Sequence, residues 1–301
     1  MVITFWVIVS ILYFITNYAF KNIILSPRKT KEDAFNLLSE KNIYNKENFD
    51  ESILEEIKIK SSDNLELNGY YVKNSCDSNK VMILIHGYTA NHYMSLQFLD
   101  FYLNKGFNIL LIDSRSHGKS LGKYATYGIK ERDDIKLWID FLRVKLGNHI
   151  IIGLHGQSMG ASTALMYGGK YKDIDFIIAD CPYSSGRDIL KYQFKNIVKV
   201  PPYPLYQMVN TLFNIRCKFS MNKVSPLDDI SNLKIPILFI HGKNDKIIPY
   251  SMSKKMYDIR NNPDDKILLV KDADHVDSYM CDKVTYEKTI DDFINATIKY
   301  I

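Results

Sequence analysis

The feature that most constrains the fold is a serine between two glycines, where an apolar run gives way to a helix-forming segment. Residues 150–154 are typical of a buried strand, and residues 161–171 are rich in helix-forming Ala, Leu and Met. Gly156-Gln157-Ser158-Met159-Gly160 lies between them. A strand-to-helix turn strains the serine and exposes its Oγ, and the glycines prevent collisions with the neighbouring strand and helix. The stretch therefore predicts that Ser158 is a nucleophile.

Apolar runs alternate with amphipathic segments along most of the chain. Strands are predicted over residues 53–60, 65–72, 81–85, 107–112, 150–154, 174–179, 235–240 and 266–270. Helices are predicted over residues 91–105, 129–146, 161–171, 251–260 and 282–300. This alternation predicts one α/β domain over residues 51–301, with a mainly parallel sheet covered by helices on both faces. Its functional site is expected at the carboxyl ends of the strands.

The alternation is interrupted over about residues 182–232. This stretch is rich in aromatic residues and prolines, including the run Pro201-Pro202-Tyr203-Pro204. Insertions of this length are usually functional, so we expect a lid of short helices over one end of the sheet. The aromatic residues could line a substrate pocket or form the core of the lid itself.

The first 20 residues contain no charged side chain. As a helix they would span about 30 Å, which is the thickness of the hydrocarbon core of a bilayer. A cleavable signal peptide is disfavoured because no basic residue precedes the apolar run and no small-residue cleavage site follows it. We therefore predict a transmembrane anchor over residues 1–25 and a linker with one short helix over residues 26–50.

Positive charge follows the predicted anchor, at Lys21, Arg28, Lys29 and Lys31. This bias predicts a single-pass protein of the cell membrane whose catalytic domain lies in the cytoplasm. The net charge of +5 is scattered and forms no basic stripe interleaved with aromatic residues, so no nucleic-acid partner is expected. The four cysteines are widely spaced, which argues against a metal motif or a dense disulfide framework and favours a reducing compartment.

A nucleophilic serine needs a base, and the base needs an acid that orients it. Of the seven histidines, His275 is the best base because it follows the last predicted strand in a loop where no packing role is evident. His86 and His241 each precede a glycine at a strand end and are interpreted as structural. Asp245 is the predicted acid, with Asp180 as its rival. The order serine, aspartate, histidine is that of the α/β-hydrolases.

An oxyanion hole requires two N–H donors about 3 Å from the developing charge. The amide of Met159, immediately after the nucleophile, is one candidate. The amide of Tyr88, in His86-Gly87-Tyr88 after the predicted strand over residues 81–85, is the other.

Several motifs, in order along the chain, resemble those of the α/β-hydrolase fold serine hydrolases. They are His86-Gly87-Tyr88-Thr89-Ala90, Asp113-Ser114-Arg115-Ser116-His117-Gly118-Lys119-Ser120, Gly156-Gln157-Ser158-Met159-Gly160, His241-Gly242-x-x-Asp245-x-x-x-Pro249 and Asp274-His275. From about residue 53 to its end the chain is similar to the membrane-anchored bacterial branch related to Bem46-like and serine aminopeptidase-like hydrolases. Ser116 departs from the pattern, because relatives commonly carry glycine there. The resemblance implies hydrolysis of an ester, thioester or amide through an acyl-enzyme, without a metal or an organic cofactor.

The expected substrate is a small-molecule carboxylic ester, or a thioester, with a medium-length or amphiphilic acyl group, since apolar walls suit an acyl chain. Two alternatives stay open. One is a serine peptidase or amidase of the same fold, although the insertion offers no clear acidic pocket for a peptide amine. The other is a catalytically silent, membrane-tethered binding protein. The sequence does not determine the oligomeric state.

Overall fold

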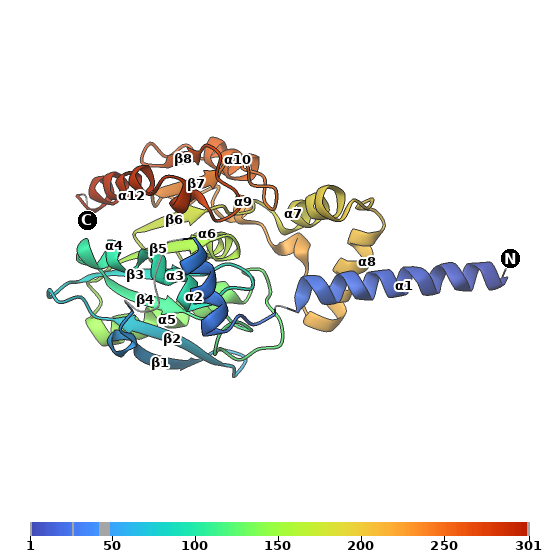
Figure 1. The fold of residues 1–301 in the computed structure, drawn as a ribbon, viewed down its shortest axis with the longest axis horizontal. Helices are drawn as coiled ribbons and strands as arrows, with labels where there is room; N and C mark the ends of the chain where they lie inside the picture. Colours follow the sequence, from blue (N-terminus) through green and yellow to red (C-terminus); the bar gives the residue numbers. More distant parts are fainter. Residues whose placement is uncertain (1, 26, 42–48, 300–301) are drawn as a thin grey trace.

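The computed structural model describes residues 2–25, 27–41 and 49–299. Its centre is an eight-stranded sheet in the order β1-β2-β4-β3-β5-β6-β7-β8 (Figure 1). Only the pairings of β1 with β2 and of β2 with β4 are antiparallel, which confirms the mainly parallel sheet. The strands are β1 Glu55–Lys60, β2 Glu66–Val72, β3 Lys80–Ile85, β4 Asn108–Ile112, β5 Ile151–Gln157, β6 Phe176–Asp180, β7 Ile237–Gly242 and β8 Lys266–Val270.

Helices cover both faces of the sheet, because the central strands are apolar on both sides. One face packs against α3 His92–Ser95, α4 Leu99–Asn104 and α12 Lys283–Ile298. The other packs against α5 Glu131–Leu146, α6 Met159–Tyr171 and α10 Ser251–Ile259. The main difference between the predicted and the observed helices lies in residues 91–105. These residues form α3 and α4 with a tighter 3-10 turn, Leu96–Phe98, between them.

The insertion forms three short helices, α7 Gly186–Gln193, α8 Leu205–Leu212 and α9 Pro226–Asp229, and α7 and α8 each continue into one π-helical turn. Helices α7 and α8 form the lid and lie beside the carboxyl ends of the strands, whereas α9 packs against α6 (Figure 1). The aromatic side chains serve mainly as the core of the lid. Phe194, Phe213 and Phe219 are each less than 5% exposed and pack in one apolar cluster.

The amino-terminal segment forms one long helix, α1 Val2–Ile24, which packs along α8 and then projects beyond the domain (Figure 1). No helix among the described residues is both long and apolar enough to cross a membrane. The predicted transmembrane anchor is therefore not supported, and the membrane location and the cytoplasmic side stay predictions.

The segment predicted as a linker contains a helix that belongs to the core. Helix α2, Lys31–Glu40, begins with a capping box between Thr30 and Asp33. Its Phe35 and Leu38 are 2% and 0% exposed. The short predicted helix is thus present and packs against α3. Residues 42–48 of the predicted linker lie outside the described part of the chain.

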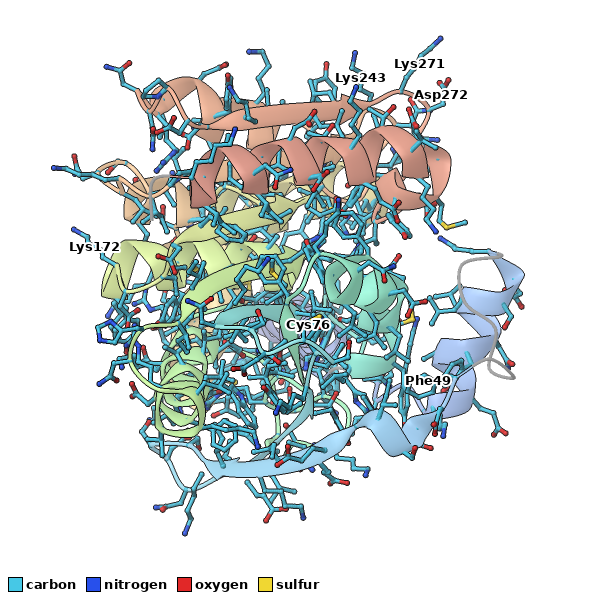
Figure 2. All side chains as sticks on the ribbon, turned by 90° about the vertical axis from the view of Figure 1, so that its left-hand side faces the viewer. Phe49, Cys76, Lys172, Lys243, Lys271 and Asp272 are labelled. Carbon is cyan, nitrogen blue, oxygen red and sulfur yellow. The ribbon has the colours of Figure 1, made fainter. Side chains whose placement is uncertain are left out.

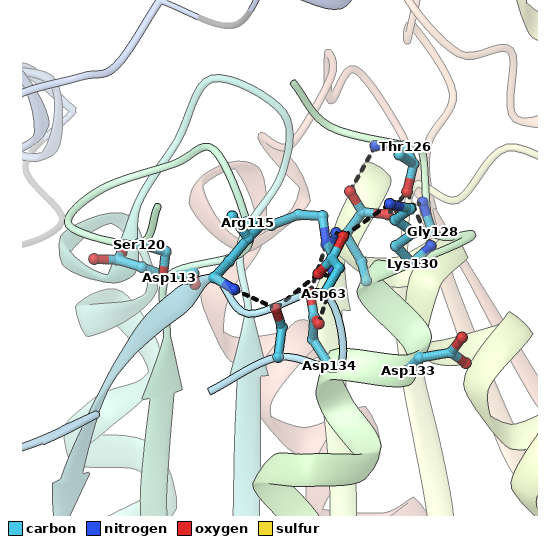
Figure 3. A network of polar contacts seen from close by, with 12 residues as sticks. Asp63, Asp113, Arg115, Ser120, Thr126, Gly128, Lys130, Asp133 and Asp134 are labelled. Carbon is cyan, nitrogen blue, oxygen red and sulfur yellow. Dashed lines mark hydrogen bonds and ion pairs between the residues drawn. The ribbon is translucent and has the colours of Figure 1, made fainter. Parts of the chain in front are cut away.

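A buried ion pair supports the turn that follows β4. The guanidinium of Arg115 forms two hydrogen bonds to the Asp134 carboxylate on α5, of 2.7 and 2.6 Å, and a third of 3.0 Å to Asp63 in the β1–β2 turn (Figure 3). In the same turn Ser116 has φ 64°, a conformation that favours glycine. Glycine, which the resemblance leads one to expect at this position, would adopt this positive φ without strain.

The end of the molecule away from the amino terminus carries scattered charge. Figure 2 looks at this end, where Lys243 and Lys271 extend outwards near each other at the top and Lys172 extends outwards at the left. Cys76, labelled in the same view, is exposed, and all four cysteines are free thiols.

Candidate active site

Ser158 lies on the sharp turn between β5 and α6, with φ 54° and ψ −115°. A Cβ on Gly156 would lie 2.4 Å from the carbonyl carbon of Gly160, and a Cβ on Gly160 would lie 2.1 Å from the Ile85 carbonyl oxygen. Both glycines are therefore required by close backbone contacts, as the sequence predicts. The turn sets the serine in a sparsely populated conformation, which is common for active-site residues.

The structure brings the predicted base and acid to this serine. His275 Nε2 lies 2.9 Å from Ser158 Oγ, and His275 Nδ1 lies 2.7 Å from Asp245 Oδ2. With Nδ1–H donating to the carboxylate, Nε2 is free to accept the serine proton. The three side chains come from the β5–α6 turn, the loop after β7 and the loop after β8; β7 and β8 are adjacent in the sheet, and β6 lies between β5 and β7.

Asp245 is held by four donors. Its Oδ1 accepts the amides of Ile247 and Ile248, both at 2.8 Å, and its Oδ2 accepts His241 Nε2 at 3.1 Å in addition to His275. Burial alone would raise the pKa of Asp245, but the hydrogen bonds from His241 and His275 outweigh it and hold the pKa well below its usual range. The acid is therefore an ionised carboxylate with a fixed orientation.

Asp180, the rival acid, has other partners. It ends β6, and its Oδ2 accepts hydrogen bonds of 3.1 Å from the Gln157 amide and from the Tyr286 hydroxyl. Tyr286 in turn lies 3.1 Å from His155 Nε2. Complete burial raises the pKa of Asp180, although these donors oppose the rise. The structure places this carboxylate in a buried network under the site rather than on His275.

Met159 and Tyr88, whose amides are the predicted oxyanion donors, line the same cavity as Ser158. Met159 is the first residue of α6, so its amide has no partner within the helix. On the other side, a Cβ built on Gly87 would lie 3.9 Å from Ser158 Oγ, which places the loop before Tyr88 against the nucleophile. The positive end of α6 also favours negative charge at this point.

Ser158 and His275 open into a cavity of about 400 Å³. None of the described residues that line it is an aspartate, glutamate, lysine or arginine. The lining is instead mainly aliphatic and aromatic: Asn22, Ile23, Tyr88, Thr89, Tyr127, Ser158, Met159, Tyr183, Ile189, Leu190, Gln193, Met221, Ile247, Ile248 and His275. Such a pocket suits an apolar group next to the reacting carbonyl.

One group of side chains in the site could be considered as metal ligands. Cys181 Sγ and ligand atoms of Asp245 and His275 lie within 4.8 Å of one another. Burial, however, raises the pKa of the Cys181 thiol well above its usual value, and a metal binds the thiolate. Because the carboxylate and the imidazole already bond to each other, this geometry fits the hydrogen-bonded triad better than a metal site.

Sequence reasoning missed two contributions. The sequence indicates only a satisfied polar group at His241, but in the structure this histidine donates to the same oxygen of Asp245 as His275 does. Its spacing of four residues before the acid, on the end of β7, was the available signal. Asn22 and Ile23, at the end of α1, line the cavity. Nothing in the local sequence of a predicted membrane anchor pointed to that role.

Comparison with known proteins agrees with this geometry. Residues 80–225 match the protein family described as "alpha/beta hydrolase fold". The uncharacterized protein YqkD of Bacillus subtilis is 32% identical over 275 residues, covering 91% of this chain and 90% of its own length. Protein bem46 of Schizosaccharomyces pombe is 24% identical and covers 80% of this chain and 76% of its own.

Among solved structures, the Pyrococcus furiosus esterase Pf2001 superimposes with a TM-score of 0.68 at 26% identity, over 91% of this chain and 98% of the esterase. The long match to YqkD, the family match over the strand-turn-helix segment and this superposition agree with one another. The chain belongs to the α/β-hydrolase fold family.

Proposed function

We propose that this protein is a serine hydrolase that cleaves carboxylic esters, and thioesters of the same acyl groups, through an acyl-enzyme intermediate. One observation carries the proposal: Ser158 and His275 of the hydrogen-bonded chain Ser158–His275–Asp245 line a largely apolar cavity in which no described lining residue is an aspartate, glutamate, lysine or arginine. A nucleophile with an oriented base and a place for an acyl chain is what ester hydrolysis requires.

The reaction follows from the positions of the groups. His275 Nε2 takes the proton of Ser158 as Oγ attacks the carbonyl carbon, and the amides of Met159 and Tyr88 bind the oxyanion. Asp245 stabilises the imidazolium. The imidazolium then gives its proton to the oxygen or sulfur of the leaving group, which departs as an alcohol or a thiol. The acyl group remains bound to Ser158 as the acyl-enzyme. Water, deprotonated by His275, attacks the ester and releases the acid and the free serine.

The walls of the cavity favour an acyl substrate over a peptide. A peptidase that binds a free amine or a charged side chain needs an opposite charge nearby, and no described residue of the lining supplies one. Aliphatic side chains such as Leu190 and Met221 instead offer contact to methylene groups. The superposition on an esterase supports the same choice.

The proposal is tested by labelling the purified full-length protein with a fluorophosphonate and by hydrolysis of p-nitrophenyl esters. Ser158→Ala should abolish labelling and lower kcat by about a millionfold, and His275→Ala should have a comparable effect. Matched controls are Ser251→Ala and His149→Ala, since both residues are exposed and lie away from the cavity.

The outcome that would refute the proposal is wild-type protein that neither labels nor hydrolyses an ester of any chain length. A silent binding protein would then explain the pocket better. Hydrolysis of aminoacyl amides in preference to esters would favour the peptidase instead.

A further inference from the structure

The last turn of α1 lies inside the substrate site. Asn22 and Ile23 line the same cavity as Ser158 and His275. We propose that this turn is a wall of the acyl pocket, that Ile23 limits the acyl-chain length the enzyme accepts, and that Tyr88 couples the helix to the oxyanion loop. The chain-length part rests on the proposed ester hydrolysis, whereas the wall itself does not.

The end of α1 is packed as part of the lid. Phe20 and Ile24 are 7% and 1% exposed and belong to the apolar cluster that contains the lid core. The rings of Phe20 and Phe213 lie 5.4 Å apart, and the guanidinium of Arg216 lies 5.2 Å from the Phe20 ring centre. This end is therefore held in place, and a side chain at position 23 has a defined location.

Two tyrosine hydroxyls fix the helix end to the wall of the site. Tyr88 donates to the Ile23 carbonyl at 2.9 Å, and Tyr127 donates to the same oxygen at 2.5 Å. The two rings are stacked with centres 5.6 Å apart. Carbonyls in the last turn of a helix have no partner within the helix, so this oxygen is available to both hydroxyls.

Tyr88 gives the contact a consequence for the chemistry. Its amide is a proposed oxyanion donor, while its hydroxyl holds α1. Because one residue carries both groups, loss of the hydroxyl contact should loosen the loop that binds the oxyanion. Tyr127 makes the same contact to Ile23 but contributes no oxyanion donor, so it is the matched comparison. Tyr88 thus acts as a positioning residue through its side chain.

The exposed side chains of α1 provide a control on the same helix. Trp6, Phe14 and Tyr18 are 61%, 71% and 74% exposed, and none of them lines the cavity. Figure 1 shows the amino-terminal part of α1 extending away from the domain. A substitution at Tyr18 changes α1 without changing the pocket.

The test uses full-length protein and p-nitrophenyl esters from acetate to dodecanoate. Ile23→Trp should lower the ratio of kcat/KM for decanoate to that for acetate by about tenfold, since each methylene that loses burial costs roughly fourfold. Ile23→Ala should raise the ratio about threefold, and Tyr18→Ala should keep the wild-type profile. If both Ile23 profiles superimpose on the wild type, Ile23 does not limit the chain.

The coupling is tested by Tyr88→Phe and Tyr127→Phe. Tyr88→Phe should lower kcat for the acetate ester several-fold more than Tyr127→Phe does, with KM changing similarly in both. Equal kcat values in the two variants would overturn the coupling, because a purely structural role predicts no difference between them.

A binding measurement separates failure of the wall from failure of the proposed function. In the Ser158→Ala background, which cannot turn over, a fluorescent dodecanoic acid should bind with a Kd about tenfold higher when Ile23→Trp is added. If the wild-type protein hydrolyses no ester but the Ile23 variants still shift this Kd, Ile23 lines a pocket for an acyl chain and the proposed hydrolase activity is wrong. An unchanged Kd in both Ile23 variants would show that the last turn of α1 is not a wall of the acyl pocket.

Discussion

The two sides of the catalytic cavity are built differently. On the sheet side, the reacting groups are fixed by polar contacts, and Asp245 alone accepts four hydrogen bonds. On the lid side, Ile189, Leu190 and Met221 are held by apolar packing, and their side chains offer no hydrogen-bonding group apart from the weakly accepting sulfur of Met221.

This difference separates the chemistry from the choice of substrate. Polar networks tolerate little change, because a buried group that loses its partner is costly. Apolar side chains in a wall can be exchanged for others of similar volume at a smaller cost in stability. Substitutions on the sheet side should therefore reduce turnover, whereas those on the lid side should alter which acyl chain is preferred.

The largest effect is expected at the acid. Asp245→Asn should reduce kcat by about ten-thousandfold, because the amide cannot orient and stabilise the His275 imidazolium as a carboxylate does. The measurement is ester hydrolysis together with a thermal unfolding curve that shows a folded protein. Asp180→Asn is the matched control and should retain most activity, since Asp180 contacts Gln157 and Tyr286. Full activity in Asp245→Asn would transfer the role to Asp180.

A smaller loss on the same side is expected at His241. His241→Leu removes one donor to the Asp245 carboxylate, and hydrogen bonds to charged groups are worth about 1.5–3 kcal/mol, so kcat should fall by roughly ten- to a hundredfold. His241→Gln retains an N–H donor and should recover part of the loss. Equal kcat values in the wild type and the leucine variant, both folded, would show that the other three donors are sufficient.

A fall in pH should lower the free energy of unfolding because two histidines are buried on the sheet side. Burial lowers the pKa of both His86 and His155 to about 3, whereas an unfolded chain has the ordinary value of 6.5. Their contribution to stability is thus complete above pH 6.5. It is lost as the pH falls towards 3, because only the unfolded chain then takes up the protons.

Each of these histidines should contribute up to about 1.4 kcal/mol per pH unit to the fall in unfolding free energy. Urea unfolding at pH 7, 6 and 5 measures the slope. His155→Gln, which can still bond to Tyr102 and Tyr286, should show a shallower slope than the wild type. The lid, residues 182–232, contains no histidine, so Ile189→Val should keep the wild-type slope. A steeper slope in His155→Gln would contradict this account.

The smallest effect is expected on the lid side. Ile189→Val removes one methylene from a residue that is 4% exposed and lines the cavity. It should raise KM for long-chain esters about two- to fourfold while kcat stays near the wild-type value. The chain-length series checks this. A fall in kcat with an unchanged KM would show that the two sides of the cavity are not separable.

Most of the fold could be predicted because its signals are local. The apolar runs placed all eight strands to within about three residues, and strand β8 spans the predicted residues 266–270. The exception was the helix expected over residues 91–105, which is divided into α3, a 3-10 turn and α4. The spacing of apolar residues indicates which face of a helix is buried, but it does not show where the backbone changes from an α-helix to a 3-10 turn.

Ser158 and His275 could be predicted because the residue type and its position after a predicted strand were enough to identify each of them. The choice between Asp180 and Asp245 was harder, because both follow neighbouring strands, β6 and β7. Only the carboxylate of Asp245 bonds to His275, whereas that of Asp180 accepts from Gln157 and Tyr286. The direction in which each carboxylate points depends on contacts that strand patterns do not contain.

The sequence by itself determined the alternation of strands and helices, the glycines of the turn at Ser158 and the chain order of the reacting groups. These depend on neighbours along the chain, where backbone sterics and apolar periodicity act. The tertiary structure decided which aspartate meets His275 and that α1 packs on the lid with Ile23 in the cavity. Such contacts join residues that are far apart along the chain, 30 positions for Asp245 and His275 and 65 for Ile23 and Tyr88, and they depend on how whole elements pack.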